Sequence, residues 1–304
     1  MIREADLVSA LKLDIIVPSA TGELPINEAN ICRPGLQLTG YWDFFAFERP
    51  QLFGKVEMAY LDTLDEATLG ARLNTFFSFA LPCVIVCRGH SIPPIMLELA
   101  KKRSIPVYRT NEITVKLEMD IINYLRDALA PSITMHGVLV DVYGVGLLLT
   151  GKSGVGKSES ALELVKRGHR LVADDVVGIK KVNETRLTGT APEAIRHLME
   201  IRGIGLIDIY TMYGVASVIR SKSIDLVVHM ELWQEGASYE RLGMSTQTKE
   251  ILGVKVPYLL LPIHPGRNIA IVLEVAARNL RLKQMGFSAA DVLLSRQEKL
   301  AGKE

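Results

Sequence analysis

The chain has 304 residues, 48% of them apolar, and is therefore long enough for two domains, each with a sizeable core. Its 35 basic and 34 acidic residues give a formal net charge of +1, which excludes an overall field that recruits nucleic acid or an anionic membrane. A charged start, no run of eighteen apolar residues, and three cysteines without zinc-type or disulfide spacing predict a cytoplasmic protein that does not span a membrane.

The first part of the chain alternates strand-like and helical patterns, which is typical of an α/β domain. Strands are expected at 13–17, 81–86 and 105–108, and helices at 94–102 and 114–130. The last helical pattern closes at Ala130-Pro131-Ser132, because proline does not continue a helix. The pattern therefore predicts an N-terminal α/β domain over 1–130 and a second domain over 131–304.

A hairpin is expected near the start of the second domain. The apolar runs 138–142 and 146–150 flank a glycine-bearing turn. Folding this hairpin back places His136 level with Thr150 and Gly151. His136 is then a candidate active-site residue. The alternative is a surface or core histidine whose hydrogen bonds are satisfied locally and which has no role in the site.

A phosphate-binding loop follows the hairpin, because eight residues match the pattern G-x-x-x-x-G-K-[ST]. In such a loop, backbone N–H groups surround a polyphosphate, the lysine reaches the outer phosphates and the hydroxyl holds Mg²⁺. An apolar run at 145–150 and helical spacing from Ala161 to Val165 supply the required strand and helix, whereas a chance glycine-rich turn would lack them. The predicted nucleotide-binding residues are Gly151, Lys152, Ser153, Gly154, Val155, Gly156, Lys157 and Ser158.

Two aspartates come directly after the next expected strand, 170–173. Such a strand normally lies in the same sheet as the loop, with its carboxyl end beside the phosphates. Asp174 and Asp175 are therefore candidates for two tasks, one in the Mg²⁺ shell and one as the acceptor of a proton from an attacking hydroxyl. The alternative is a pair of solvated turn residues.

Two further segments carry candidate site residues. In 199–208, Glu200 is a third carboxylate able to bind a metal, and two glycines allow close backbone approach, although a bulged strand and its turn would look the same. In 262–267, His264 and Arg267 lie before a helix, where an anion site is natural. Helices are expected at 268–285 and 288–300, packing on a neighbouring subunit.

In order and spacing, these motifs resemble those of the HPr kinase/phosphorylase family. The resemblance rests on His136 in His-Gly-Val-Leu-Val-Asp, the phosphate loop, Ala173-Asp-Asp, Glu200-Ile-Arg-Gly-Ile-Gly-Leu-Ile-Asp208 and Pro-Gly-Arg-Asn268. It implies a C-terminal P-loop kinase domain with a mixed sheet, similar to that of phosphoenolpyruvate carboxykinase, in a homohexamer. It also implies an enzyme that uses ATP to phosphorylate a serine of the phosphocarrier protein HPr, and inorganic phosphate to remove that group as pyrophosphate.

The resemblance also implies roles for individual residues. Lys157 would contact the outer phosphates, and Ser158 with Glu200 would bind Mg²⁺. Asp175 would accept the proton in phosphorylation and return it in dephosphorylation, assisted by Asp174. His136 and Arg241 would share the same pocket, although Arg241 taken alone equally fits an exposed helix charge. The segment 199–208 would serve both reactions, and dephosphorylation would depend mainly on Pro262, Ile263, His264, Pro265, Gly266 and Arg267, where His264 replaces an expected arginine or lysine.

Two other functions fit parts of the sequence. A GTPase-type switch is favoured by Asp175-Val-Val-Gly178, but the chain has no N-K-x-D motif to read guanine. A P-loop small-molecule kinase or a phosphoenolpyruvate carboxykinase-like enzyme would have a similar loop. Protein kinases of the glycine-rich-loop type are excluded, because H-R-D and D-F-G are absent.

Overall fold

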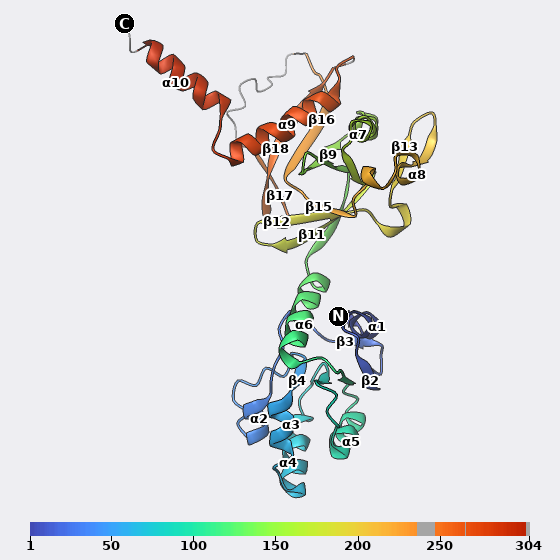
Figure 1. Cartoon of the computed structure of the whole chain (residues 1–304), viewed down its shortest axis with the longest axis vertical. Helices are drawn as coiled ribbons and strands as arrows, with labels where there is room; N and C mark the ends of the chain where they lie inside the picture. The colour runs from blue at the N-terminus through green and yellow to red at the C-terminus, as the bar shows by residue number, and fades with distance from the viewer. Residues whose placement is uncertain (236–246, 265, 302–304) are drawn as a thin grey trace. The chain divides into compact units, whose positions relative to one another are not determined.

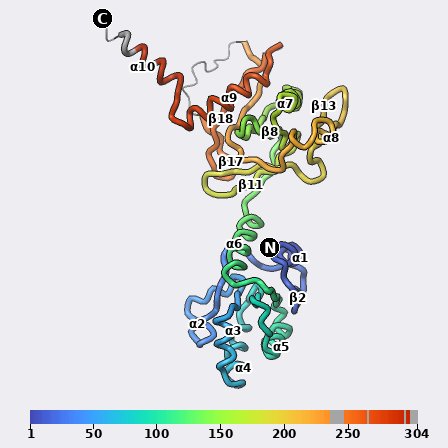
Figure 2. The backbone as a smooth tube through the Cα atoms, viewed as in Figure 1, coloured from blue at the N-terminus to red at the C-terminus, as the bar shows by residue number. Residues whose placement is uncertain are grey.

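The computed structural model describes residues 1–235, 247–264 and 266–301, and the chain forms two compact units, Met1–Ala130 and Pro131–Glu304 (Figures 1 and 2). Within the described part of the chain, no helix combines the length and the apolar character needed to cross a membrane.

The first unit contains a four-stranded sheet of order β2-β6-β5-β4, in which β4, β5 and β6 are parallel and β2 is antiparallel. Its strands are β2 (Asp14–Val17), β4 (Gln51–Phe53), β5 (Val84–Val86) and β6 (Val107–Arg109), and β1 (Ile2–Arg3) pairs separately with β3 (Glu23–Leu24). The helices are α1 (Glu4–Leu11), α2 (Gly35–Thr39), α3 (Lys55–Leu61), α4 (Glu66–Phe76), α5 (Pro94–Lys102) and α6 (Thr114–Ala128).

The expected strands and helices of this unit are present, with shorter strands. β5 and β6 begin only after Pro82 and Pro106, which have no N–H group to donate to a neighbouring strand. Successive side chains alternate between two apolar cores, so that Phe53 and Val84 face one and Leu52 faces the other. The sheet is therefore buried on both faces.

The second unit is built on a six-stranded sheet of order β10-β8-β9-β16-β18-β17. β9, β16 and β18 are parallel and the other pairings are antiparallel, so the predicted mixed sheet is confirmed. The strands are β8 (Val138–Val142), β9 (Val145–Gly151), β10 (Arg170–Ala173), β16 (Leu226–Leu232), β17 (Thr248–Ile251) and β18 (Val254–Ile263). Each of β9, β10, β16 and β18 therefore ends at the same edge of the sheet.

Two helices, α7 (Lys157–Lys166) and α9 (Ile269–Gln284), cover one face of this sheet. A four-stranded antiparallel sheet covers the other face, where Leu139 and Leu148 pack against Val177. The strands of this second sheet are β7 (Ser132–His136), β11 (Val176–Asn183), β12 (Arg186–Thr190) and β15 (Ser221–Ser223). The remaining elements are β13 (Leu198–Ile201), β14 (Gly205–Asp208), α8 (Ile209–Tyr213), α10 (Ala289–Ala301) and two short 3₁₀ helices, Glu193–Ile195 and Val215–Ser217.

The predicted hairpin is confirmed, but the position inferred from it for His136 is wrong. β8 and β9 pair from Val142 with Val145 to Val138 with Leu149, and the pairing stops there. His136 belongs to β7 and lies opposite Val176 of β11 in the second sheet. The chain leaves the hairpin at Gly137, whose N–H group donates to the Asp175 carbonyl at 3.0 Å instead of extending the hairpin.

The two C-terminal helices occur where they are expected, as α9 and α10. Asn268 begins α9, because its side chain accepts a hydrogen bond from the Ile271 N–H group at 3.3 Å. Ile271 and Val275 leave large apolar side chains exposed on α9. Packing of these helices on a neighbouring subunit stays a prediction.

Gly146 of β9 lies where the two sheets of the second unit pack closely together, against the backbone of β15. A Cβ added there would lie 1.7 Å from the Ser223 carbonyl oxygen, which is a backbone atom that cannot move independently. We expect Gly146→Ala to lower the free energy of unfolding by about 3 kcal/mol. Gly178→Ala is the matched control, because its Cβ would meet Thr190 Oγ1 at an ordinary 3.5 Å, and it should change stability by less than about 1 kcal/mol. Urea unfolding measures both, and equal losses would contradict the packing argument.

Candidate active site

The phosphate loop joins the carboxyl end of β9 to the start of α7, so the predicted order of strand, loop and helix is confirmed. Its first and last glycines adopt positive φ angles, 137° at Gly151 and 95° at Gly156. A Cβ added to Gly151 would lie 2.2 Å from the Met230 carbonyl oxygen on the neighbouring strand β16. The glycine at this position is therefore required by both the backbone angle and the space.

Lys157, the first residue of α7, lies against the loop it follows. Its Nζ donates to the carbonyl oxygens of Gly151 at 3.0 Å and Lys152 at 3.1 Å. The ammonium group is thus held at the helix N-terminus, where unpaired N–H groups add to its positive potential. This arrangement can bind a polyphosphate.

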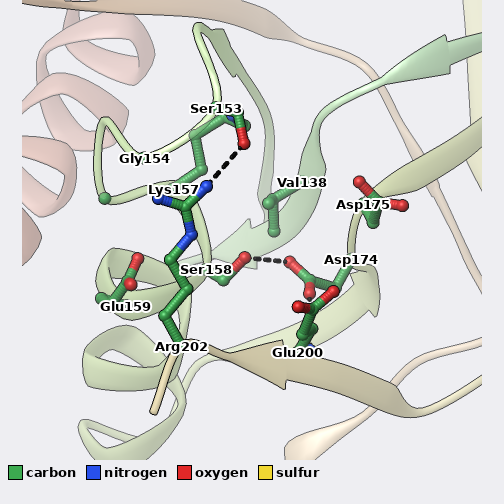
Figure 3. A pocket seen from close by; sticks show the side chains of 11 residues that line it. Val138, Ser153, Gly154, Lys157, Ser158, Glu159, Asp174, Asp175, Glu200 and Arg202 are labelled. Carbon is green, nitrogen blue, oxygen red and sulfur yellow. Dashed lines mark hydrogen bonds between the residues drawn. The ribbon is translucent and has the colours of Figure 1, made fainter. Parts of the chain in front are cut away.

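A pocket opens beside the loop (Figure 3). It is lined by residues of the loop, α7, the turn between β10 and β11, and the hairpin formed by β13 and β14. Its lining residues are Val138, Ser153, Gly154, Gly156, Lys157, Ser158, Glu159, Asp174, Asp175, Glu200 and Arg202. Elements separated by up to 64 positions, from Val138 to Arg202, therefore converge on one cavity.

Asp174 lies at the carboxyl end of β10 and is only 5% exposed. Its Oδ1 accepts from Ser158 Oγ at 2.8 Å and its Oδ2 from the Glu200 N–H group at 3.2 Å. Burial raises the pKa of this carboxyl above its ordinary value, although the two hydrogen bonds oppose that shift. Its contribution to stability is therefore greatest when it is protonated and is lost as the pH rises through the raised pKa, unless a cation compensates the charge.

The oxygen donors around Asp174 fit a magnesium ion. The Ser158 hydroxyl and the carboxylates of Asp174 and Glu200 line the same pocket, and Mg²⁺ prefers such oxygen ligands. Within the residues that the structure describes, no three His, Cys, Asp or Glu side chains are grouped closely enough to hold a metal by themselves. An ion here would therefore need further oxygens, and Mg²⁺ commonly takes these from substrate phosphates and water.

Asp175 differs from its neighbour in nearly every respect. Its side chain is 72% exposed, and its φ angle of 62° lies in the left-handed region, which is uncommon for a residue with a Cβ atom. His136 Nδ1 lies 3.8 Å from Asp175 Oδ1, so the structure brings these two predicted residues together, although His136 does not line the pocket. The two aspartates are not an equivalent pair of solvated turn residues, because one is buried and bonded.

The hairpin of β13 and β14 forms one wall of the pocket. Ile201 pairs with Gly205, and Gly203 and Gly205 have φ angles of 87° and 103°, so the glycine pair shapes the turn. Glu200 lies on this hairpin, as does Arg202, whose Nη2 donates to Ser153 Oγ at 2.8 Å. The sequence prediction did not single out Arg202. Its spacing of two residues from Glu200, which favours the same face of an extended strand, was the available signal.

The segment 262–267 has the predicted form, since it leaves β18 and leads into α9. The His264 ring lies 4.6 Å from that of Trp233, and the Arg267 N–H group donates to the His264 carbonyl at 3.2 Å. None of its described residues lines the pocket. Pro265 and Arg241 lie outside the described residues.

Comparison with known proteins identifies the family of the chain. A solved structure, of the Hpr(Ser) kinase/phosphatase from Coxiella burnetii, is 36% identical with a TM-score of 0.47, covering 51% of this chain and 93% of that one. Two relatives are named HPr kinase/phosphorylase. The relative from Caldanaerobacter subterraneus subsp. tengcongensis is 50% identical over 287 residues, which cover 94% of each chain. The relative from Geobacillus thermodenitrificans is 44% identical over 295 residues, which cover 97% of this chain and 96% of the relative. The family descriptions "HPr Serine kinase N terminus" and "HPr Serine kinase C-terminal domain" match residues 2–125 and 127–297. With both of its halves matched, the chain belongs to the HPr kinase/phosphorylase family.

Proposed function

We propose that this protein transfers a phosphoryl group from ATP to a serine of an HPr-type phosphocarrier protein, and removes it with inorganic phosphate to give pyrophosphate. The observation that carries this proposal is the pocket in which a phosphate loop and its lysine face one buried and one exposed aspartate. Phosphoryl transfer needs positioning, charge neutralisation and a proton acceptor more than covalent chemistry. The pocket has a residue for each of these tasks.

In the forward reaction, the seryl oxygen attacks the γ-phosphorus of ATP. A bond forms between these atoms, the bond from the γ-phosphorus to the bridging oxygen of ADP breaks, and Asp175 accepts the seryl proton. Lys157 and the N–H groups of the loop hold the phosphates. Ser158 and Glu200, assisted by Asp174, would hold Mg²⁺, which supplies neutralising charge when bound.

In the reverse reaction, an oxygen of inorganic phosphate attacks the phosphorus of phosphoserine. The serine oxygen leaves with the proton that Asp175 returns, and the products are the free serine and pyrophosphate. Asp175 can serve both directions, because the proton that it accepts from serine in phosphorylation is the one that it returns to serine in dephosphorylation. His136, 3.8 Å from the Asp175 carboxylate, would help to orient it.

Further assignments rest on the family resemblance. Arg241 is proposed as an active-site residue, and the segment 262–267 as one needed mainly for dephosphorylation. The segment begins with the last residues of β18, which ends at the same edge of the sheet as the phosphate loop, where α/β proteins bind ligands. We also propose a homohexamer that acts in the cytoplasm.

The transfer itself tests the proposal. Purified protein with radiolabelled ATP and Mg²⁺ should label HPr but not an HPr variant whose target serine is alanine. Labelled HPr should lose its phosphate, with pyrophosphate released, when inorganic phosphate replaces ATP. ATP turnover on a small molecule without HPr would favour a small-molecule kinase, and nucleotide binding without any transfer would favour a switch.

The segment 262–267 predicts a direction-specific variant. The reverse reaction must hold phosphate beside phosphoserine, two anions that repel, whereas ATP carries its phosphates already joined. We expect Arg267→Ala to lower dephosphorylation at least about tenfold more than phosphorylation. Both rates are measured on the same HPr, with Arg278→Lys, which keeps its charge, as the control. Equal losses in the two directions would contradict the assignment.

A further inference from the structure

The pocket is poor in positive charge for its proposed ligand. Its lining contains four carboxylates, from Glu159, Asp174, Asp175 and Glu200, but only two cationic side chains, Lys157 and Arg202. Lys157 is already bonded to two carbonyl oxygens of the loop. Besides a bound cation, Arg202 is therefore the one further positive charge that the described lining offers to the polyphosphate and to the developing charge of phosphoryl transfer.

Arg202 is placed to contribute, because it reaches the phosphate loop from a different element. Figure 3 shows its side chain extending from the hairpin of β13 and β14 towards Ser153, with which it forms a 2.8 Å hydrogen bond. It forms no ion pair with any described residue. A guanidinium has five N–H donors, and a single bond to one hydroxyl leaves most of them available to an anion.

The loop itself accommodates the guanidinium. Gly154 has a φ angle of 82°, and a Cβ added there would lie 2.7 Å from Arg202 Nη1. The absence of a side chain lets the guanidinium lie directly against the loop backbone, over the position where a P-loop binds phosphate.

We infer that Arg202 is a catalytic residue, whose guanidinium exchanges its bond with Ser153 for the oxygens of the transferred phosphoryl group. This inference rests on the proposed function. Arg202 adds charge from the hairpin of β13 and β14, an element separate from the helix that carries Lys157. Because the charge on the transferred group is present in both directions, Arg202 serves phosphorylation and dephosphorylation alike.

The test compares three variants with wild type in both reactions. Arg202→Ala should lower kcat on the order of 100-fold to 1000-fold in each direction, with a much smaller change in the Kd for ATP, because the contact strengthens as charge moves in the transition state. Arg202→Lys should recover part of the lost kcat, since lysine keeps the positive charge but lacks the planar guanidinium that binds two oxygens at once. Arg186→Ala, an exposed arginine of β12, is the matched control and should match wild type.

Several outcomes would overturn the inference. A wild-type kcat in folded Arg202→Ala would remove Arg202 from catalysis, and an unchanged kcat with weaker ATP binding would make it a binding residue only. A loss in Arg202→Ala that the lysine variant does not relieve at all, with a lowered melting temperature in both, would make its role structural. Failure of the wild-type protein to phosphorylate HPr would instead refute the proposed function. This outcome can be told apart from a failure of the inference about Arg202, because it is measured on wild type before any variant is compared.

Discussion

Lys157→Ala is expected to abolish phosphoryl transfer, with a loss on the order of 1000-fold or more in kcat, while the fold stays intact. The ammonium is the cation at the helix N-terminus, and alanine removes the side-chain charge that offsets the outer phosphates there. The fold should survive because Nζ bonds only to the carbonyls of Gly151 and Lys152 in its own loop, and water can replace it. Transfer to HPr measures activity, and circular dichroism measures the fold.

Lys166→Ala is the matched control for this variant. Lys166 lies on the same helix, α7, but in its last turn and exposed, away from the pocket. The two lysines have the same charge and lie on the same helix, but only Lys157 lines the pocket, so only Lys157→Ala should lose activity. Near-wild-type transfer by a folded Lys157→Ala protein would refute the assignment of the loop.

The parts of the fold that the sequence predicted are those with local signals. The β8–β9 hairpin is closed by two residues, Tyr143 and Gly144, both with positive φ angles, which is the turn geometry that such a short loop requires. The β9 strand, the loop and α7 follow each other directly, so apolar periodicity and glycine placement were enough to locate them. The buried Asp174 also follows from its position at the end of a short apolar strand.

The second sheet could not be predicted in this way. β7 alternates polar and apolar residues over only five positions and is almost entirely exposed, so its pattern does not identify a partner strand, and its partner β11 begins 40 positions after His136. Such a register is fixed by tertiary contacts rather than by a turn. The sequence pattern therefore predicts β9 as the neighbour of His136, whereas the structure has β11 there. The contact of His136 with Asp175 results from this pairing of β7 with β11.

The same limit applies to the far wall of the pocket. Arg202 contacts Ser153 across 49 positions of sequence, and nothing local in either segment predicts this bond. The family motif drew attention to Glu200 and to the glycines of the turn. Arg202, which lies between them, enters the pocket only through the packing of the hairpin against the loop.

Asp175→Asn is expected to depress phosphorylation and dephosphorylation together, each about 100-fold to 10,000-fold, while nucleotide still binds. The amide keeps the size of the side chain but cannot accept the seryl proton or return it. Asparagine also tolerates the left-handed φ of 62° at this position better than most residues, so the backbone should be preserved. Both reactions are measured with one HPr preparation, and ATP binding is measured by calorimetry.

Asp120→Asn, an exposed aspartate of α6, is the control for an amide substitution outside the pocket and should leave both rates unchanged. The informative comparison is between directions. Asp175 is the exposed member of the pair, free to meet an incoming protein, whereas Asp174 is held by Ser158 and the Glu200 N–H group. If Asp175 moves the proton both ways, its loss cannot spare one reaction. Survival of either rate near the wild-type value would assign proton transfer in that direction to another group.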